Sequence, residues 1–545
     1  MHFTVAPHPD VKPPGCDKYL TVHVPGLQTL LLILSIHRLT PHIITMPFAV
    51  VEASPDLAIE LDVPNREYNP GETITGRVIR RSHVVSSEAL VSIKLYGRTK
   101  VRVDYTTNSG NGSQHHTVRT RFDLLGSSES GQTQFYTTIF KGPIHIPPNA
   151  DSNHPGESWP FSFTLPTGPV NPSLIRAGAN KKQKHCFLPI DPPEQITSHP
   201  LPFSFNSKVG SFWANGIESY VEYVLVSEFF EAHTSRFSSS STPKKTASAV
   251  LPVILRPPPV PPLLPDQWLL NRFVKREGVR TQMLIPSFAE AGGELSFKQK
   301  TQKFFHSSKV PKYSFDLLVL SPGVIQLGSV DPVPFKVAAV PRLGVADETS
   351  EEVRNLQKSP VVSVASLRLV VKARTEVKVG SSWVSDKFTD RVDKFFEWTW
   401  TWGWKEGEDG MALPVWDRTL GTGTGAGAGA DASFGEIDFG DEKKGKKEGS
   451  GSGGGGSSST AAVTGRQGAE PPARDIGAEL DLRFNPMELV YKGGTAKMSA
   501  ILYPDFTTYN IRRTHELKWE MVLSVAKETV KVSNSHWVKI VAPWT

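Results

Sequence analysis

The amino-acid sequence predicts an all-β protein made of two antiparallel β-sandwich domains in tandem. Three observations predict this class: apolar residues recur with a period of two on both sides of a proline-rich stretch, Gly and Pro number 44 each among 545 residues, and the first half offers no convincing helix. A period of two is the pattern of strands that are buried on one face, and frequent Gly and Pro indicate many turns. Length alone allows roughly two to four domains.

Residues 1–49 are expected to form a disordered N-terminal extension that does not belong to the fold. Their apolar run, Leu30–Leu34, is too short to cross a membrane. Basic residues follow this run, whereas in a signal peptide they precede it. Met46 opens the segment that leads into the first credible strand, so the start of the protein is either Met1 or Met46.

Residues 50–255 are expected to form the first sandwich. A turn at Asn69-Pro70-Gly71 should join its first strands, because Pro suits position i+1 and Gly suits the positive φ at i+2 of a type II turn. Gly97 lies within the longest alternating stretch, where a β-bulge would reset the register. The expected strands are Leu57–Val63, Leu90–Tyr105, Phe135–Phe140, Phe161–Leu165 and Val221–Leu225.

Residues 256–280 are expected to connect the two sandwiches. The run Arg256–Pro265 is too rich in Pro for a central strand, so it predicts a stiff polyproline helix. A short helix is expected just after it, with one face formed by Trp268, Leu269, Phe273 and Val274.

The connector also contains a candidate docking motif. Arg256, Pro259 and Pro262 have the spacing of a basic residue followed by two ridge prolines, a form that Src-homology 3 domains bind as a left-handed helix. The plainer alternative is a spacer that holds the two sandwiches at a fixed angle.

Residues 281–545 are expected to form the second sandwich, interrupted by a disordered Gly-rich insert at 405–475. Within this insert, residues 421–460 hold 14 Gly in 40 residues and have almost nothing to bury. The strands on both sides can still belong to one domain, because the entropy cost of closing a loop grows only slowly with its length. The expected strands are Phe315–Leu320, Phe335–Ala339, Leu367–Val379, Leu480–Phe484, Leu489–Tyr491, Met498–Leu502 and Leu517–Val525.

No motif nominates a catalytic centre, and we expect no enzyme, no cofactor and no metal. The stretch Gly440–Lys447 approaches a phosphate-binding loop but lacks its Ser or Thr, the alternating glycines from Gly421 to Gly429 do not complete a dinucleotide fingerprint, and no nucleophile elbow occurs. His115 and His116 have no His or Cys partner at zinc-finger spacing, so we interpret them as part of a solvated loop. An enzyme on a β-sandwich is the alternative from a different functional class.

Positive charge gathers in the first sandwich. Between Glu72 and Lys141 there are ten basic and five acidic residues, although the whole chain carries a net charge of only +6. The candidate face for an anionic partner consists of residues from one strand: Lys94, Arg98, Lys100 and Arg102. Such a face could attract phosphorylated tails or anionic lipid head groups, and the alternative is a solvated sheet face. Nucleic acid is not expected, because no aromatic residues are interleaved with these bases to stack on nucleotides.

Two sets of sequence blocks add a resemblance to this picture. The first set is Tyr68–Val78 (YNPGETITGRV), Val91–Arg98 (VSIKLYGR), Gly156–Pro166 (GESWPFSFTLP) and Ile217–Val226 (IESYVEYVLV). The second set is Val310–Phe315, Val324–Gly328, Pro504–Arg513 and Leu517–Trp519. The first set resembles the arrestin N-terminal domain, and the second is similar to the second domain of fungal α-arrestin-like proteins. The resemblance covers most of residues 50–541 and implies two arrestin-like, immunoglobulin-like sandwiches.

The resemblance implies a non-enzymatic adaptor. Members of the family link the tails of membrane transporters or receptors to ubiquitin ligases and to the endocytic machinery. HECT-type ligases with WW domains read a Pro-Pro-x-Tyr motif on a flexible tail. The protein would then be cytoplasmic and peripherally recruited to the plasma membrane or endosomes. The presence of only two cysteines, Cys16 and Cys186, agrees with a reducing compartment.

The sequence departs from the family pattern at the ligase motif. No Pro-Pro-x-Tyr occurs, and the nearest variant contains Pro311 and Tyr313, which run directly into an apolar strand. These two residues are either a docking site for a ligase or a buried strand start. A scaffold for cargo sorting or pH signalling without ligase recruitment, similar to the retromer arrestin-like subunit, is therefore the alternative function.

Overall fold

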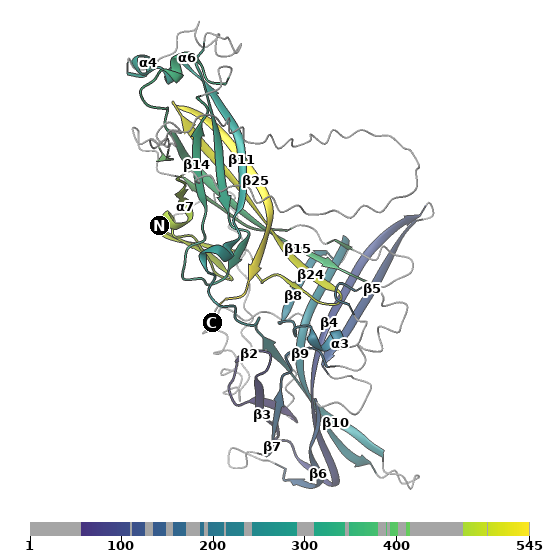
Figure 1. The fold of residues 1–545 in the computed structure, drawn as a ribbon. Coiled ribbons are helices and arrows are strands. Elements are labelled where there is room, and N and C mark those ends of the chain that lie inside the picture. Colours follow the sequence, from purple (N-terminus) through teal and green to yellow (C-terminus); the bar gives the residue numbers. More distant parts are fainter. Residues whose placement is uncertain are drawn as a thin grey trace, which may run out of the picture. The chain divides into compact units, whose positions relative to one another are not determined.

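Antiparallel β-sheets make up most of the described structure, which confirms the prediction of an all-β protein (Figure 1). The computed structural model describes residues 56–543 except 110–111, 126–134, 149–155, 171–185, 190–193, 212–213, 234–241, 291–309, 344–347, 380–387, 390–392, 402–409, 415–471 and 499. These residues all belong to one unit, Ala49–Thr545. The predictions for residues 1–49 and 421–460 lie outside the described residues.

The strands of the first half are β1 (Ala58–Leu61), β2 (Glu67–Tyr68), β3 (Thr73–Arg80), β4 (Val84–Ser109), β5 (Gly112–Leu125), β6 (Tyr136–Ile146), β7 (Glu157–Thr164), β8 (Phe205–Ser211), β9 (Ala214–His233) and β10 (Thr242–Leu255). The strands of the second half are β11 (Asn271–Arg280), β12 (Lys312–Ser321), β13 (Val324–Gln326), β14 (Lys336–Pro341), β15 (Val362–Val377), β16 (Phe388–Thr389), β17 (Asp393–Thr401), β18 (Met411–Ala412), β19 (Arg474–Asp475), β20 (Arg483–Phe484), β21 (Glu488–Tyr491), β22 (Gly494–Lys497), β23 (Phe506–Thr507), β24 (Ile511–Val525) and β25 (Glu528–Val541). The described helices are short: α3 (Glu194–Ser198), η2 (Pro265–Trp268), η3 (Gln282–Leu284), α4 (Pro286–Glu290), α6 (Glu351–Arg354) and α7 (Ile476–Glu479).

Two sheets of the first half bury a common hydrophobic cluster. The smaller sheet has the order β1-β3-β7, and the larger one has the order β2-β10-β9-β4-β5, with β6 also paired to β4 and β8 to β9. Val91 and Ile93 of β4 meet Ile74 of β3 and Phe161 of β7 in this cluster. Each strand expected in this half overlaps one of the observed strands. Pro160 lies inside β7, which is tolerated because β7 is an edge strand of its sheet.

The turn before β3 has the predicted geometry. Glu72 N donates a hydrogen bond of 3.1 Å to Asn69 O, which closes the four-residue turn. Gly71 has a φ of +91°, as position i+2 of a type II turn requires. A residue with a Cβ would be strained there, so Gly71 is needed for its backbone conformation.

The long strand β4 differs from the prediction at Gly97. A register shift does occur there, but Leu125 pairs with Gly97 and Asp123 with Arg98, so the extra residue belongs to β5. The pairing of β4 with β9 runs through Gly97 without a shift. The alternation of side chains along β4 is therefore not reset. Gly97 is required for another reason, since a Cβ would lie 2.6 Å from the ring of Tyr223.

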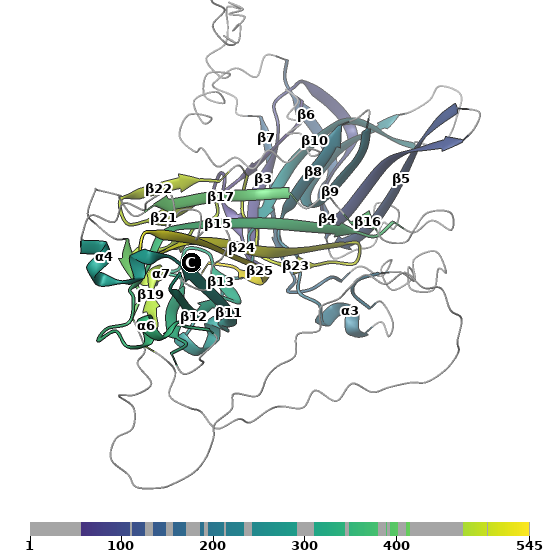
Figure 2. The ribbon, with the colours of Figure 1, turned by 90° about the horizontal axis from the view of Figure 1, so that it is seen from above.

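The second half contains three further sheets around a second hydrophobic cluster. Their orders are β11-β12-β14-β19, β13-β25-β24-β15-β16 and β20-β21-β22. The second of these has eight strands, because β17 and β18 also pair with β15, and β23 pairs with β24. Figure 2 shows β15, β24 and β25 side by side. Along β24 the side chains alternate strictly between buried and half-buried, as the sequence predicted. Trp519 of β24 and Phe335 before β14 belong to the core of this half.

Aromatic side chains of the two halves contact each other. Phe205 of β8 packs edge to face against Tyr503 and Phe506, with ring centroids 5.1 and 4.7 Å apart. His199 Nδ1 lies 3.2 Å from the hydroxyl of Tyr509. Residues from both halves of the chain therefore contribute to the hydrophobic cluster of the first half.

Several local predictions were wrong. The helix expected just after Arg256–Pro265 is only the 3-10 turn η2. Residues 271–280, which were expected to belong to the connector, form β11, which contains Phe273 and Val274 and is held by pairing with β12. Residues 500–502 form no strand, and of Leu480–Phe484 only the last two residues do. The insert at 405–475 is ordered near both ends, where β18 and β19 pair with β15 and β14. His115 and His116 lie in β5 and not in a loop.

Candidate functional site

Lys94, Arg98, Lys100 and Arg102 project from one side of β4, which we call the β4 face. The intervening residues, such as Leu95 and Val101, point to the hydrophobic cluster of the first half. The four cations share a face because β4 keeps its alternation through Gly97. They lie over the central strands of the seven-stranded sheet, where β4 runs beside β9 (Figure 1).

Carboxylates on β9 neutralise two of these cations. Lys94 Nζ lies 2.9 Å from a carboxylate oxygen of Glu228, and Arg98 forms an ion pair with Glu222, its direct cross-strand partner. Burial raises the pKa of Glu228, but the hydrogen bonds and charges of Lys94 and Lys245 outweigh this effect and hold the pKa below its usual value. The side chain of Glu222 is only 3% exposed. Its pair with Arg98 is therefore part of the structure of the sheet.

Arg102 is paired within its own strand. Its Nε lies 3.0 Å from a carboxylate oxygen of Asp104. The hydroxyl of Thr117 on β5 donates a hydrogen bond of 2.5 Å to the same carboxylate. Arg102 is thus committed to a local network that joins β4 to β5.

Lys100 differs from its three neighbours. Among the residues that the structure describes, it has no carboxylate partner, and its Nζ lies 5.6 Å from the ring centroid of Tyr220. Burial lowers the pKa of Lys100, the charge of Arg98 lowers it further, the charge of Glu222 raises it, and the charges of Arg121 and Arg119 lower it again. The net pKa shift is downward, so the repulsion from neighbouring cations and the burial outweigh the attraction of Glu222.

Arg119 of β5 adds a second uncompensated cation to the β4 face. It lies opposite Arg102, and in the described part of the chain it forms no ion pair. Arg121, opposite Lys100, pairs with Asp123 at 2.5 Å. The free positive charge of this face is therefore concentrated at Lys100 and Arg119. The sequence identified Lys100, but it gave no reason to choose it or Arg119 over the other cations.

Replacing Lys100 and Arg119 together by Gln is expected to weaken binding to anionic membranes. The measurement is co-sedimentation of the full-length protein with phosphatidylserine vesicles. Salt should weaken the binding of the parent between about 50 and 300 mM, where the Debye length falls from roughly 14 to 6 Å. The thermal midpoint should hardly change, because neither cation forms an ion pair among the described residues and surface charges contribute little to stability.

Arg272→Gln with Lys539→Gln is the matched control. Both residues are exposed cations of the second half, and neither forms an ion pair among the described residues. This control should bind vesicles like the parent. Equal binding by the Lys100 and Arg119 variant would show that the β4 face is only a solvated surface.

The two candidate docking motifs have different surroundings. Pro259 and Pro262 are exposed on the connector, and Arg256 beside them is half-buried. Pro311 and Tyr313, by contrast, are buried, and the side chain of Tyr313 is 0% exposed in β12. A side chain without exposed surface cannot enter the pocket of another protein. In this fold Pro311 and Tyr313 are therefore a buried strand start and not a docking site.

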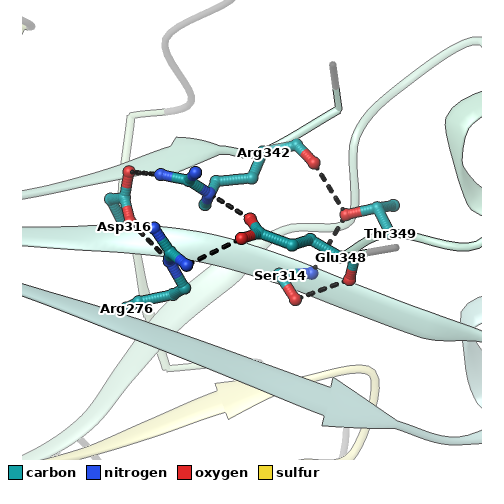
Figure 3. Close-up of polar contacts among 6 residues, drawn as sticks. All are labelled: Arg276, Ser314, Asp316, Arg342, Glu348 and Thr349. Atoms are coloured by element: carbon teal, nitrogen blue, oxygen red, sulfur yellow. Dashed lines mark hydrogen bonds and ion pairs between the residues drawn. The ribbon is translucent and has the colours of Figure 1, made fainter. Parts of the chain in front are cut away.

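A charged cluster that the sequence did not indicate lies on the four-stranded sheet (Figure 3). Arg342 contacts Asp316 at 2.8 Å and also pairs with Glu348, and Arg276 contacts Glu348 at 2.7 Å. Burial lowers the pKa of Arg342, but its hydrogen bonds to the two carboxylates outweigh this and raise it. Two cations and two anions compensate each other. The cluster holds the segment after β14 to β11 and β12 and leaves no excess charge for a ligand.

The residues that the structure describes contain no group of three or more His, Cys, Asp or Glu side chains that could hold a metal ion. No described helix has the length and apolar character needed to cross a lipid bilayer. Comparison of the chain with protein-family models gives no match, and neither does comparison with curated proteins.

Proposed function

We propose that the protein is a non-enzymatic adaptor with two arrestin-like β-sandwiches in tandem. The observation that carries this proposal is the division of the sheets into two groups around two large hydrophobic clusters, joined by the connector after β10. The sequence blocks that resemble arrestin domains fall in the strands and turns of these groups. Tyr68–Val78, for example, spans the type II turn and β3.

The proposed cargo is the cytoplasmic tail of a membrane transporter or receptor. The β4 face supports this choice, because Lys100 and Arg119 offer uncompensated positive charge on an extended sheet. An acidic or phosphorylated tail, or the membrane beside it, supplies the opposite charge. The adaptor would act in ubiquitin-dependent endocytosis, recruited from the cytoplasm to the plasma membrane or endosomes.

One observation favours a second function, a cargo-sorting or pH-signalling scaffold that does not recruit a ligase itself. The chain has no Pro-Pro-x-Tyr motif, and the nearest variant is buried at Tyr313. A WW domain could not reach this tyrosine in the folded protein. The two functions share the fold and the cargo, and they differ in the complex that the adaptor brings to the cargo.

Affinity purification of the tagged full-length protein from its own cells tests both functions. The experiment compares cells with and without a shift in nutrient or pH. Joint recovery of a transporter and a HECT-type ligase is the result expected for the first function. A transporter with sorting subunits and without a ligase would favour the second. Recovery of neither would contradict the adaptor proposal.

A further inference from the structure

The side chains of residues 257–265 in the connector follow a period of three in their exposure. Every third residue is half-buried, and the two residues between are exposed. The half-buried positions are Pro257, Val260 and Leu263, and the exposed positions are Pro258, Pro259, Pro261, Pro262, Leu264 and Pro265. Three residues per turn is the repeat of a polyproline II helix. The connector therefore lies with one edge against the protein and two edges in solvent.

The inner edge is fastened through the backbone. Gln326 of β13 is 1% exposed, and its Nε2 donates hydrogen bonds of 2.7 and 3.1 Å to the carbonyl oxygens of Val260 and Pro261. Its Oε1 accepts a hydrogen bond of 3.1 Å from Leu263 N. Val260 N donates to the carbonyl oxygen of Pro543 at 3.2 Å. These hydrogen bonds use backbone groups of Val260, Pro261 and Leu263, and the exposed rings of Pro258, Pro259, Pro261 and Pro262 take no part in holding the connector.

The outer edges carry the residues of the docking motif. Arg256, Pro259 and Pro262 are spaced by three and lie along one edge, and Pro258 and Pro261 lie along the next. A groove of the Src-homology 3 kind takes two neighbouring edges of a polyproline II helix between aromatic side chains and leaves the third edge outside. Here the third edge is the one that Gln326 holds. The orientation of the connector therefore matches the orientation that such a groove needs.

Arg256 provides the charge that selects among such grooves. Its Nε donates a hydrogen bond of 2.9 Å to Asn69 Oδ1, and it has no carboxylate partner among the residues described. The contact with Asn69 holds the guanidinium at the start of the proline edge. An acidic rim on a partner could receive its remaining N–H groups in a charge-assisted pair.

We propose that the connector is a preformed ligand for a Src-homology 3 type domain with an acidic rim. A free peptide of this sequence loses conformational entropy when it binds, whereas the fixed connector has already lost it, which favours affinity. The proposal concerns a partner other than the cargo of the β4 face. It therefore does not depend on the adaptor function.

In the test, the full-length protein is titrated with each member of a panel of purified Src-homology 3 domains that have acidic rims. Calorimetry measures the affinity and the stoichiometry of binding. Saturable binding of one domain per chain is expected. Pro259→Ala with Pro262→Ala should weaken it about tenfold or more, the change that corresponds to about 1.4 kcal/mol. Arg256→Glu should weaken it as well, because it repels the rim. The thermal midpoint of each variant shows whether the fold is retained.

Val260→Ala is the matched control, since this side chain lies on the inner edge and should not touch the partner. It should keep the affinity of the parent. Absence of binding to every domain of the panel would overturn the proposal. So would equal affinity of the proline variant and the parent, or an equal loss with Val260→Ala. Unchanged affinity of Arg256→Glu would overturn the role of the acidic rim.

Discussion

Trp519→Ala is expected to lower the free energy of unfolding by about 3–5 kcal/mol, the usual range for truncating a buried large aromatic side chain. Trp519 lies on β24 and is 0% exposed. Its ring packs edge to face against Phe273 of β11 and Phe335 before β14, with centroids 5.1 and 6.0 Å apart. The indole therefore fills the space where the four-stranded and eight-stranded sheets meet. Chemical denaturation followed by circular dichroism measures the loss.

Trp537→Ala is the matched control, because Trp537 lies on the neighbouring strand β25 but is 57% exposed. Its cost should stay within about 0.5 kcal/mol, as for most surface substitutions. Trp519→Phe should cost much less than Trp519→Ala. It keeps most of the apolar ring and removes an indole N–H that has no hydrogen-bond partner in the described structure. Equal costs for the two alanine variants would contradict the packing described for Trp519.

The sequence predicted strands best where one face is buried and the other is half-exposed. In β24 this pattern runs from Ile511 to Val525, so a period of two was visible. It failed for β11, because most of its side chains are exposed and the strand has no apolar alternation. Trp268 and Phe273 then suggested a helix. The state of β11 is decided by pairing with β12, and local sequence does not contain that information.

The outer part of the β4 and β5 hairpin shows the same limitation. His115 and His116 lie in β5, where most side chains near them are exposed on both faces of the sheet. Without a buried face there is no periodic signal, and polar residues suggested a loop. The strand is held by backbone pairing with β4 and by stacking of His116 on Tyr105, with ring centroids 5.1 Å apart.

The candidate site was predictable in part. The placement of Lys94, Arg98, Lys100 and Arg102 on one face follows from the period of a strand, and the structure has them there. Their partners could not be predicted, because Glu222 is separated from Arg98 by more than a hundred residues and meets it only through the register of β4 and β9. The uniform positive face that the sequence suggested is therefore an alternating pattern of charges.

A buried histidine makes stability dependent on pH. His515 of β24 is fully buried, and its Nδ1 lies 2.6 Å from a carboxylate oxygen of Asp505. The same oxygen accepts a hydrogen bond from Ile540 N. Burial lowers the pKa of His515, the hydrogen bond to Asp505 raises it, and the charge of Arg513 lowers it, with a net shift below the ordinary value. The neutral ring with its proton on Nδ1 fits this geometry.

Protonation of the folded protein is unfavourable at the second ring nitrogen. Nε2 of His515 is buried and has no hydrogen-bond partner among the described residues, so a proton added there would bring a buried N–H without an acceptor. The neighbours across the sheet, Ala373 and Val538, are apolar. Burial also lowers the pKa values of His199 and His536. All three histidines therefore favour the neutral form when the chain is folded.

The sign of the effect follows from proton linkage. In the unfolded chain a histidine has a pKa of 6.5, so below this pH the unfolded chain takes up protons that the folded chain does not. The stabilisation is fully present above pH 6.5 and is lost as the pH falls toward the lower folded pKa values. Each such proton contributes a slope of about 1.4 kcal/mol per pH unit. We therefore expect the free energy of unfolding to fall steadily below pH 6.5.

His515→Asn isolates the contribution of the buried ring. The amide N–H of Asn can take the place of Nδ1–H and donate to Asp505, but it does not titrate. Denaturation curves at several pH values should show a slope that is smaller below pH 6.5, by at most about 1.4 kcal/mol per pH unit, because one linked proton is removed. The stability of the variant above pH 7 serves as the control that the fold is retained. An unchanged slope would mean that His515 takes up its proton equally in the folded and unfolded chains, and the pair with Asp505 would then have no part in acid sensitivity.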